Sequence, residues 1–232
     1  MKRVVLKLSG EALSAGSSDI YNGDFVAEVA AAIKSCADEG YEIAVVVGAG
    51  NIWRGRQGGN MDRTAADRMG MLATVINAIY VKDALEQAGA RARVMTAIAM
   101  PPFAQLYSAE AADEALRAGE IVVFGAGLGI PFLSTDTAGA VRASEISADA
   151  MLMAKNIDYI YTADPRLDPT AKKLERIKAS EVLAMNLKAI DATATAFCMS
   201  AGMPIKVFGL KSGNDIIRAI HGELCGTEVV AE

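Results

Sequence analysis

Short runs of β-branched residues alternate along this chain with longer alanine-rich stretches, and this alternation constrains the fold more than any other feature. The segments 3–8, 42–47 and 120–124 read RVVLKL, EIAVVV and EIVVF. Strands that are apolar on both faces belong inside a mostly parallel sheet that helices cover on either side. We therefore predict an α/β fold, a three-layer α-β-α sandwich with a mostly parallel central sheet.

The hydrophobic periodicity divides the chain into alternating elements. Strands are predicted at Arg3–Leu8, Glu42–Val47, Ala92–Thr96, Glu120–Phe124, Ala150–Ala154, Ile160–Tyr161 and Ile205–Phe208. Helices are predicted at Phe25–Glu39, Asp62–Gln87, Ala109–Ala118, Thr137–Ile146, Ser180–Ala184, Ala192–Ser200 and Asn214–Ile220, with a loop at Ala163–Lys172. The 232 residues contain no internal repeat, low-complexity tract or linker, so we expect a single domain, 1–232, with two lobes at about 1–150 and about 151–232.

The ionisable residues exclude several kinds of chemistry. A single histidine, His221, and three scattered cysteines, Cys36, Cys198 and Cys225, supply neither a zinc site nor a histidine-based triad. The net charge is 23 − 28 = −5, which argues against nucleic-acid polymers and anionic membranes as partners. The odd cysteine count, the lack of a signal peptide and the lack of a membrane-spanning apolar stretch predict a cytoplasmic protein.

Three glycine-bearing loops follow predicted strands: Ser9-Gly10, Gly48-Ala49-Gly50-Asn51 and Gly125-Ala126-Gly127-Leu128-Gly129. Each could be only a tight turn. Loops at the carboxyl ends of strands nevertheless meet at one edge of an α/β sheet, and glycine lets their backbone N–H groups approach a phosphate. None of the loops reads G-x-G-x-x-G, and the absence of a Gly-Lys dipeptide excludes a Walker A loop.

Lys7 is the one charged residue inside the apolar run Val4–Leu8. An unpaired ammonium group in a buried strand is costly, so Lys7 must reach the strand end and meet an anion. Two partners remain open: an aspartate in a structural ion pair, or a phosphoryl group.

The other candidate charges also have two interpretations. Ser134-Thr135-Asp136 has the composition of a helix N-cap, Asp164 that of a turn, and Asp67 lies on the long predicted helix with an exposed face as its default. Arg54 and Arg56 follow a glycine loop and either bind phosphate or lie solvated in the loop. These residues indicate a phosphate-binding α/β protein, and a phosphotransferase is compatible with them.

Five motifs resemble those of bacterial uridylate (UMP) kinases, members of the amino-acid kinase superfamily. They are KLSGEAL at 7–13, GAGNIWRG at 48–55, DRMGMLAT at 67–74, PFLSTDT at 131–137 and TADP at 162–165. The motifs occur in the family's order and spacing and cover the chain nearly end to end. The blocks at 67–74 and 131–136 separate uridylate kinases from carbamate, acetylglutamate and aspartate kinases.

The resemblance implies the amino-acid kinase (carbamate kinase-like) fold and the reaction ATP + UMP → ADP + UDP in pyrimidine nucleotide biosynthesis. It implies an acceptor-binding N-terminal lobe, an ATP-binding C-terminal lobe, and Mg²⁺ that enters with ATP without dedicated protein ligands. Allosteric regulation and a homohexamer, a trimer of dimers, are further implications. Family members pair through the segment Met69–Ile76, whose apolar side chains could instead lie in the core of the same chain.

The resemblance also implies the site residues, position by position. Catalytic positions are Lys7, Asp136 and Asp191. ATP-binding positions are Lys7, Leu8, Ser9, Gly10, Gly50, Arg54, Lys155, Tyr161 and Asp164. UMP-binding positions are Ala49, Asp67, Leu128, Gly129, Ile130, Pro131, Phe132, Leu133, Ser134 and Thr135.

A few positions depart from the family's commonest pattern. Ala49 replaces a glycine, and Leu128 and Ile130 stand where many members have threonine and asparagine. Lys155 takes a position that is often an adenine-contacting threonine, and Tyr159 replaces a glycine. The predicted UMP loop therefore lacks two hydrogen-bonding side chains.

Two other functions fit the same fold. One is a non-catalytic nucleotide-binding, anion-binding or metal-oxo storage protein, and the other is a sister kinase for a small phosphate, carboxylate or carbamate acceptor. Five residues of the motifs argue against the first function: Lys7, Arg54, Asp67, Asp136 and Asp164. Asp67 argues against the second, because it would have no ribose to hold.

Overall fold

The structure is a computed structural model, and it describes residues 1–53, 59–223 and 225–232 of the chain. The strands are β1 Arg3–Leu8, β2 Glu42–Val47, β3 Ala92–Thr96, β4 Gln105–Leu106, β5 Ile121–Gly125, β6 Ala150–Lys155, β7 Ile160–Tyr161, β8 Lys173–Leu174, β9 Arg176–Lys178, β10 Ile205–Gly209 and β11 Gly226–Val230. The helices are α1 Gly10–Ser14, α2 Gly23–Asp38, α3 Arg63–Gln87, α4 Ala109–Arg117, α5 Thr135–Glu145, α6 Ala179–Ala184, α7 Ala192–Ala201 and α8 Gly213–Ile220.

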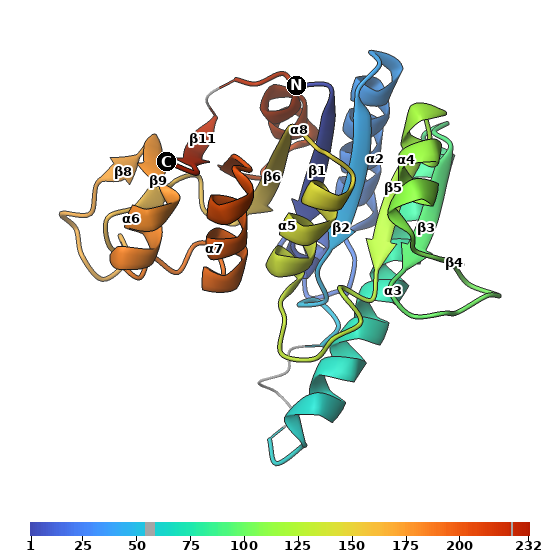
Figure 1. The fold of residues 1–232 in the computed structure, drawn as a ribbon, viewed down its shortest axis with the longest axis horizontal. Helices are drawn as coiled ribbons and strands as arrows, with labels where there is room; N and C mark the ends of the chain where they lie inside the picture. Colours follow the sequence, from blue (N-terminus) through green and yellow to red (C-terminus); the bar gives the residue numbers. More distant parts are fainter. Residues whose placement is uncertain (54–58, 224) are drawn as a thin grey trace.

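A nine-stranded sheet runs through the middle of the molecule in the order β4-β3-β5-β2-β1-β6-β10-β11-β9 (Figure 1). The pairs from β4 to β10 are parallel, and β11 is antiparallel to β10. β1 is central, with β2 on one side and β6 on the other. The loops that follow β1, β2, β5 and β6 therefore gather at a single edge of the sheet.

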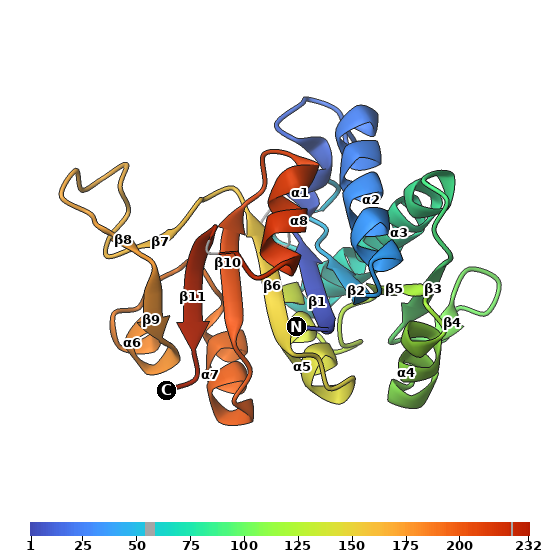
Figure 2. The same cartoon turned by 90° about the horizontal axis from the view of Figure 1, so that it is seen from above.

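Helices cover both faces of the sheet, as the view from above shows (Figure 2). One face packs against α2, α3 and α8 through residues such as Ile33, Leu85 and Ile216. The other face packs against α4, α5, α6 and α7 through residues such as Leu116 and Val182. Side chains alternate along β1, so Val4, Leu6 and Leu8 lie in the first core and Val5 in the second. The predicted three-layer sandwich with a mostly parallel sheet is confirmed.

Most predicted elements agree with the structure to within two residues, and the errors concern short ones. Sequence reasoning missed α1, β4, β8, β9 and β11. All five span five residues or fewer with little apolar periodicity, and β11 reads GTEVV, with a glycine and a charged residue in it. Such segments are ordered by their neighbours: β11 pairs with β10 and β9, and β8 pairs with β7.

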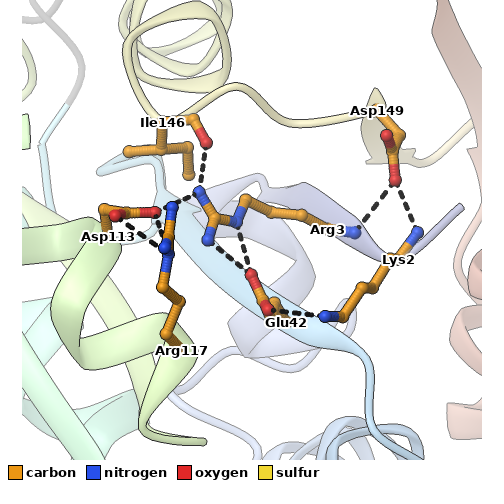
Figure 3. A network of polar contacts seen from close by, with 7 residues as sticks. All are labelled: Lys2, Arg3, Glu42, Asp113, Arg117, Ile146 and Asp149. Carbon is orange, nitrogen blue, oxygen red and sulfur yellow. Dashed lines mark hydrogen bonds and ion pairs between the residues drawn. The ribbon is translucent and has the colours of Figure 1, made fainter.

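Charged side chains tie the elements together at the amino end of the sheet (Figure 3). We call this set the amino-end network; its members are Lys2, Arg3, Glu42, Asp113, Arg117 and Asp149. Arg3 pairs with Glu42 (Nε to Oε2, 2.6 Å) and with Asp113 (Nη1 to Oδ1, 2.8 Å). It thereby joins β1 to β2 and to α4.

Across the described ranges, no helix combines the length and the apolar character that crossing a membrane requires.

Candidate active site

Lys7 lies in the core of the sheet on the face that α5 covers, and only 5% of its surface is exposed. α5 approaches this face closely at Gly139. A Cβ added there would lie 2.5 Å from Met151 Cε and 3.9 Å from Lys7 Cγ. The glycine therefore leaves room for the Met151 side chain, which packs beside the alkyl chain of Lys7 between the sheet and the helix.

Three charged groups meet where Lys7 ends; we call Lys7, Asp136 and Lys155 the lysine–aspartate cluster. Lys7 Nζ is 2.6 Å from Asp136 Oδ1, and Lys155 Nζ is 2.8 Å from Asp136 Oδ2. β1 and β6 are parallel with Lys7 opposite Met153. Because side chains alternate along a strand, Lys155 lies on the same face as Met153 and Lys7. One carboxylate thus holds two ammonium groups.

The cluster shifts the pKa values of its members. Burial alone would raise the pKa of Asp136, but the two ammonium groups outweigh it and lower that pKa to about 2. Burial, and then the charge of Lys7, lower the pKa of Lys155. Asp136 and Glu11 act in the opposite direction by favouring the charged form of Lys155.

Asp136 is not the N-cap residue that its sequence context suggested. Ser134 caps α5, and its Oγ accepts a hydrogen bond from the backbone N–H of Thr137 (3.2 Å). Asp136 lies in the first turn of the helix and points inward to Lys7. Of the two partners left open for Lys7, the aspartate is present in the structure.

Asp191 stands at the N-cap position of α7, next to the start of α5. Its Oδ2 accepts hydrogen bonds from Ser134 Oγ (2.9 Å) and Thr137 Oγ1 (2.5 Å). Asp191 is thereby tied to the helix that carries Asp136. Its link to the lysine–aspartate cluster runs through α5.

The first two glycine loops are in direct contact beside this cluster. A Cβ on Gly10 would lie 2.3 Å from the backbone N of Gly50 and 2.8 Å from the carbonyl carbon of Ala49. Gly48 N–H also donates to Leu8 O (2.8 Å). Only glycine fits at position 10, and the two loops form one layer over the carboxyl ends of β1 and β2.

A pocket of about 130 Å³ opens between the second and third glycine loops and α3. It is lined by Ala49, Trp53, Ala66, Asp67, Gly70, Met71, Thr74, Ala126, Gly127, Leu128, Ile130, Leu133 and Thr135. Six of these are predicted UMP positions: Ala49, Asp67, Leu128, Ile130, Leu133 and Thr135. Sequence reasoning placed none of the other seven in the UMP site, although Ala66, Gly70 and Thr74 share one face of the long helix at a spacing of four.

Asp67 is mostly buried, so its default interpretation as an exposed helix residue is wrong. Both of its carboxylate oxygens lie 3.0 Å from Arg63 Nε, one turn earlier in α3. Its Oδ2 also accepts a hydrogen bond from the backbone N–H of Phe132 (2.8 Å). The carboxylate therefore joins α3 to the loop 128–135 at the pocket.

The remaining predicted ATP positions lie further along the chain. Tyr161 OH donates to Asp158 Oδ1 (2.9 Å), and Asp164 accepts from the backbone N–H of Arg166 (2.9 Å) in the predicted turn. The side chain of Arg166 and then its backbone N–H lower the pKa of Asp164 to about 2. β7 and β8 lie well away from β1 (Figure 2). Arg54 and Arg56 lie outside the described residues.

In the part of the chain that the structure describes, no group of three or more histidine, cysteine, aspartate or glutamate side chains is arranged to hold a metal ion. Both oxygens of Asp136 already accept from ammonium groups.

The model of the amino acid kinase family matches residues 2–209. The chain belongs to the amino acid kinase family. Within it, the sequence and the fold are similar to those of UMP kinases of known structure.

The UMP kinase of Bacillus anthracis is 34% identical, with a TM-score of 0.95 over 100% of this chain and 96% of that chain. The UMP kinase of Ureaplasma parvum is 34% identical, with a TM-score of 0.93 over 99% of this chain and 98% of that one. The uridylate kinase of Archaeoglobus fulgidus is 27% identical, with a TM-score of 0.75 over 99% of this chain and 100% of that one. The resemblance seen in the motifs is confirmed along the whole chain.

Proposed function

We propose that this chain is a uridylate kinase that transfers the γ-phosphoryl group of ATP to UMP, giving ADP and UDP, in pyrimidine nucleotide biosynthesis. The observation that carries this proposal is the lysine–aspartate cluster, a buried pair of ammonium groups on one carboxylate, at the same sheet edge as the Asp67 pocket. The full-length similarity to UMP kinases supports the choice of acceptor.

Lys7 and Lys155 are the proposed cations for the transferred phosphoryl group. Phosphoryl transfer needs alignment and compensation of negative charge more than covalent chemistry, and fixed cations in a dry site supply that compensation. Since Lys155 shares Asp136 with Lys7, we assign it to the phosphates rather than to adenine. Asp136 orients both lysines and does not act as a base, because the UMP phosphate is already ionised.

The glycine loops complete the donor side. In this proposal Leu8, Ser9, Gly10 and Gly50 line the site of the ATP phosphates, as the resemblance implies. Tyr161 and Asp164 take the adenosine, so that the N-terminal lobe of about 1–150 binds the acceptor and the C-terminal lobe of about 151–232 binds ATP. Arg54 is kept as an ATP contact on the strength of the resemblance alone.

The acceptor occupies the pocket between α3 and the loop 128–135. Asp67 accepts the ribose hydroxyls there, so a deoxyribose loses a hydrogen bond to this carboxylate and binds worse. Leu128 and Ile130 contribute apolar surface, so backbone groups of residues 128–135 must supply the hydrogen bonds to uracil.

Mg²⁺ is part of the proposed reaction as a component of the ATP substrate. Mg²⁺ keeps several waters and binds through nucleotide phosphates in most kinases, so it requires no cage of protein carboxylates. Asp191 helps to place α5, and with it Asp136, through Ser134 and Thr137.

A homohexamer, a trimer of dimers, is proposed on the basis of α3. Sequence reasoning left Met69–Ile76 either in the core or at an interface, and the helix divides between the two. Met71 and Val75 are buried, whereas Leu72 and Ile76 are 53% and 52% exposed. Light scattering of the protein at micromolar concentration tests the assembly, and a monomer would remove it. Allosteric control and a cytoplasmic location stay predictions.

The alternatives have no comparable support within the described residues. A storage protein has no use for the lysine–aspartate cluster next to two phosphate-binding loops, and a kinase for a small acceptor has none for Asp67 in the pocket.

The decisive experiment is an acceptor panel with ATP and Mg²⁺. We expect UMP to be phosphorylated well above CMP, dUMP and AMP. Binding of ATP without transfer to any monophosphate would contradict the proposal and favour a binding protein.

A further inference from the structure

Asn77 is a fully buried polar residue in the middle of α3, and its amide is satisfied on every side. Its Nδ2 donates to Gly48 O (2.6 Å) and to Asn51 Oδ1 (2.8 Å). Its Oδ1 accepts from Tyr21 OH (2.8 Å) and from Asn51 Nδ2 (3.2 Å). A buried amide left without partners is costly, so a fully satisfied amide holds its partners in one arrangement.

Two of these partners belong to the second glycine loop, one at each end of it. Gly48 opens the loop, Asn51 closes it, and the two asparagine amides form a reciprocal pair. Asn51 is fixed from a second direction because its Nδ2 also lies 3.0 Å from Ile20 O. The residues between these anchors, Ala49 and Gly50, press against Gly10 of the first loop.

The same helix anchors the third glycine loop one turn earlier. Thr74 Oγ1 accepts a hydrogen bond from the backbone N–H of Ala126 (2.8 Å) and donates to Met71 O (2.6 Å). Asp67, nearer the start of the helix, accepts from the backbone of Phe132. Three polar side chains of α3 thus each hold one loop segment near the pocket. Asn77 holds the loop 48–51, Thr74 holds the third glycine loop, and Asp67 holds the loop 128–135.

We propose that Asn77 is a positioning residue that fixes the loop 48–51 in the conformation that places it against Gly10, beside the proposed site of the ATP phosphates. This inference rests on the proposed function for the identity of the ligand. That Asn77 fixes the conformation of the loop follows from the hydrogen bonds alone. Asn77 acts through the loop and contacts no substrate.

The test compares Asn77→Ala with Val81→Ala, a matched control one turn further along α3. Val81 is as buried as Asn77 and packs in the apolar core. Both variants lose buried atoms, so both lower the melting temperature. We expect only Asn77→Ala to raise the KM for ATP, by about tenfold, as the loss of about one well-placed hydrogen bond would.

Two further measurements keep loop positioning apart from general stability. In the ligand-free protein, hydrogen exchange at the backbone of residues 48–51 should become faster in Asn77→Ala and stay unchanged in Val81→Ala. Asn51→Ala removes the same amide pair from the loop side, so the double variant should have no higher KM for ATP than either single variant. Asn51→Ala carries the same expectation should Asn77→Ala fail to fold.

An Asn77→Ala or Asn51→Ala variant with unchanged KM for ATP and unchanged exchange in the loop would overturn the inference. If the unmodified protein phosphorylates no monophosphate, the proposed function fails. The exchange comparison then still decides whether Asn77 holds the loop.

Discussion

The two ends of β1 carry two charged assemblies of different design. At the amino end, three cations, Lys2, Arg3 and Arg117, meet three carboxylates, and each carboxylate has a cation or a backbone N–H beside it (Figure 3). At the carboxyl end, Lys7 and Lys155 share the single carboxylate of Asp136. The strand between them is six residues long.

Their exposure differs as well. The Lys2 and Arg117 side chains are 77% and 72% exposed, whereas those of Lys7 and Asp136 are 7% and 10% exposed. Water compensates much of the charge at the amino end, but a buried ammonium group without a full partner is costly. Glu11 offsets part of this cost, because its charge favours the charged form of Lys155. The comparison shows that the ratio of cations to carboxylates matters more than the number of ion pairs. It distinguishes a salt-bridge network that only stabilises the fold from a site that can bind an anion.

The largest expected effect is a loss of activity when the carboxyl end of β1 is changed. Lys7→Ala should lower kcat by about 100-fold to 1,000-fold, because one fixed charge opposite the transition state is lost. The fold should persist, since Asp136 keeps Lys155 as its partner. Steady-state kinetics with ATP, Mg²⁺ and UMP measure the loss, and circular dichroism checks the fold. Full activity in this variant would remove Lys7 from the phosphate site.

Asp136→Asn should remove the negative charge that Lys7 and Lys155 share at the carboxyl end of β1. It leaves two buried ammonium groups without a carboxylate, so we expect a loss of about 3 kcal/mol in the free energy of unfolding. ATP with Mg²⁺ should raise the melting temperature more in this variant than in the unmodified protein, because the phosphates replace the missing charge. Thermal unfolding with and without ATP measures both effects. An equal shift in the two proteins would show that the phosphates lie elsewhere.

Arg3→Ala applies the matching change to the amino-end network. Glu42 and Asp113 lose a partly buried partner, so the free energy of unfolding should fall by about 1–2 kcal/mol. Urea unfolding measures this loss. The values of kcat and KM at 25 °C should not change, because the network lies at the edge of the sheet opposite the pocket. A change in kcat would mean that the two ends of β1 are coupled.

The smallest expected effect concerns acid stability. The folded pKa of Asp136, about 2, lies below its ordinary value of 3.8, so the charged carboxylate stabilises the fold above about pH 4. That stabilisation is lost as the pH falls from 4 through 2, and it amounts to at most about 2 kcal/mol. Urea unfolding between pH 2.5 and 7 should show a shallower pH dependence in Asp136→Asn. The amino end also contributes, since the backbone N–H groups of Lys2 and Arg3 lower the pKa of Asp149. A slope unchanged by Asp136→Asn would assign acid unfolding to other carboxylates with lowered pKa values, such as Asp149 and Asp164.

The central strands and the long helices could be predicted from the sequence. Buried strands such as β1 and β2 and a long helix such as α3 carry strong periodic signals that the tertiary structure preserves. The need of Lys7 for an anion also followed from its place in an apolar strand. The missed strands β4, β8 and β9, of two or three residues each, have no such signal, because they form only where a neighbouring strand offers partners.

The partners within the site could not be predicted from the residues alone. Ser134, Thr135 and Asp136 are all good cap residues, and which of them turns inward depends on where the helix begins. Lys155 joins Lys7 because β1 and β6 pair residues that are 146 positions apart in the sequence, which no local pattern reports. Asn77 lies in an apolar helix, and its role depends on a loop 26 residues earlier.

The most direct test of the central claim is the affinity for ATP with Mg²⁺, measured by calorimetry on the Lys7→Ala/Lys155→Ala double variant and on Arg3→Ala. If the lysine–aspartate cluster binds the phosphates, the double variant should bind ATP at least about 100-fold more weakly, while Arg3→Ala keeps the affinity of the unmodified protein. A double variant that binds ATP as tightly as the unmodified protein would contradict the account.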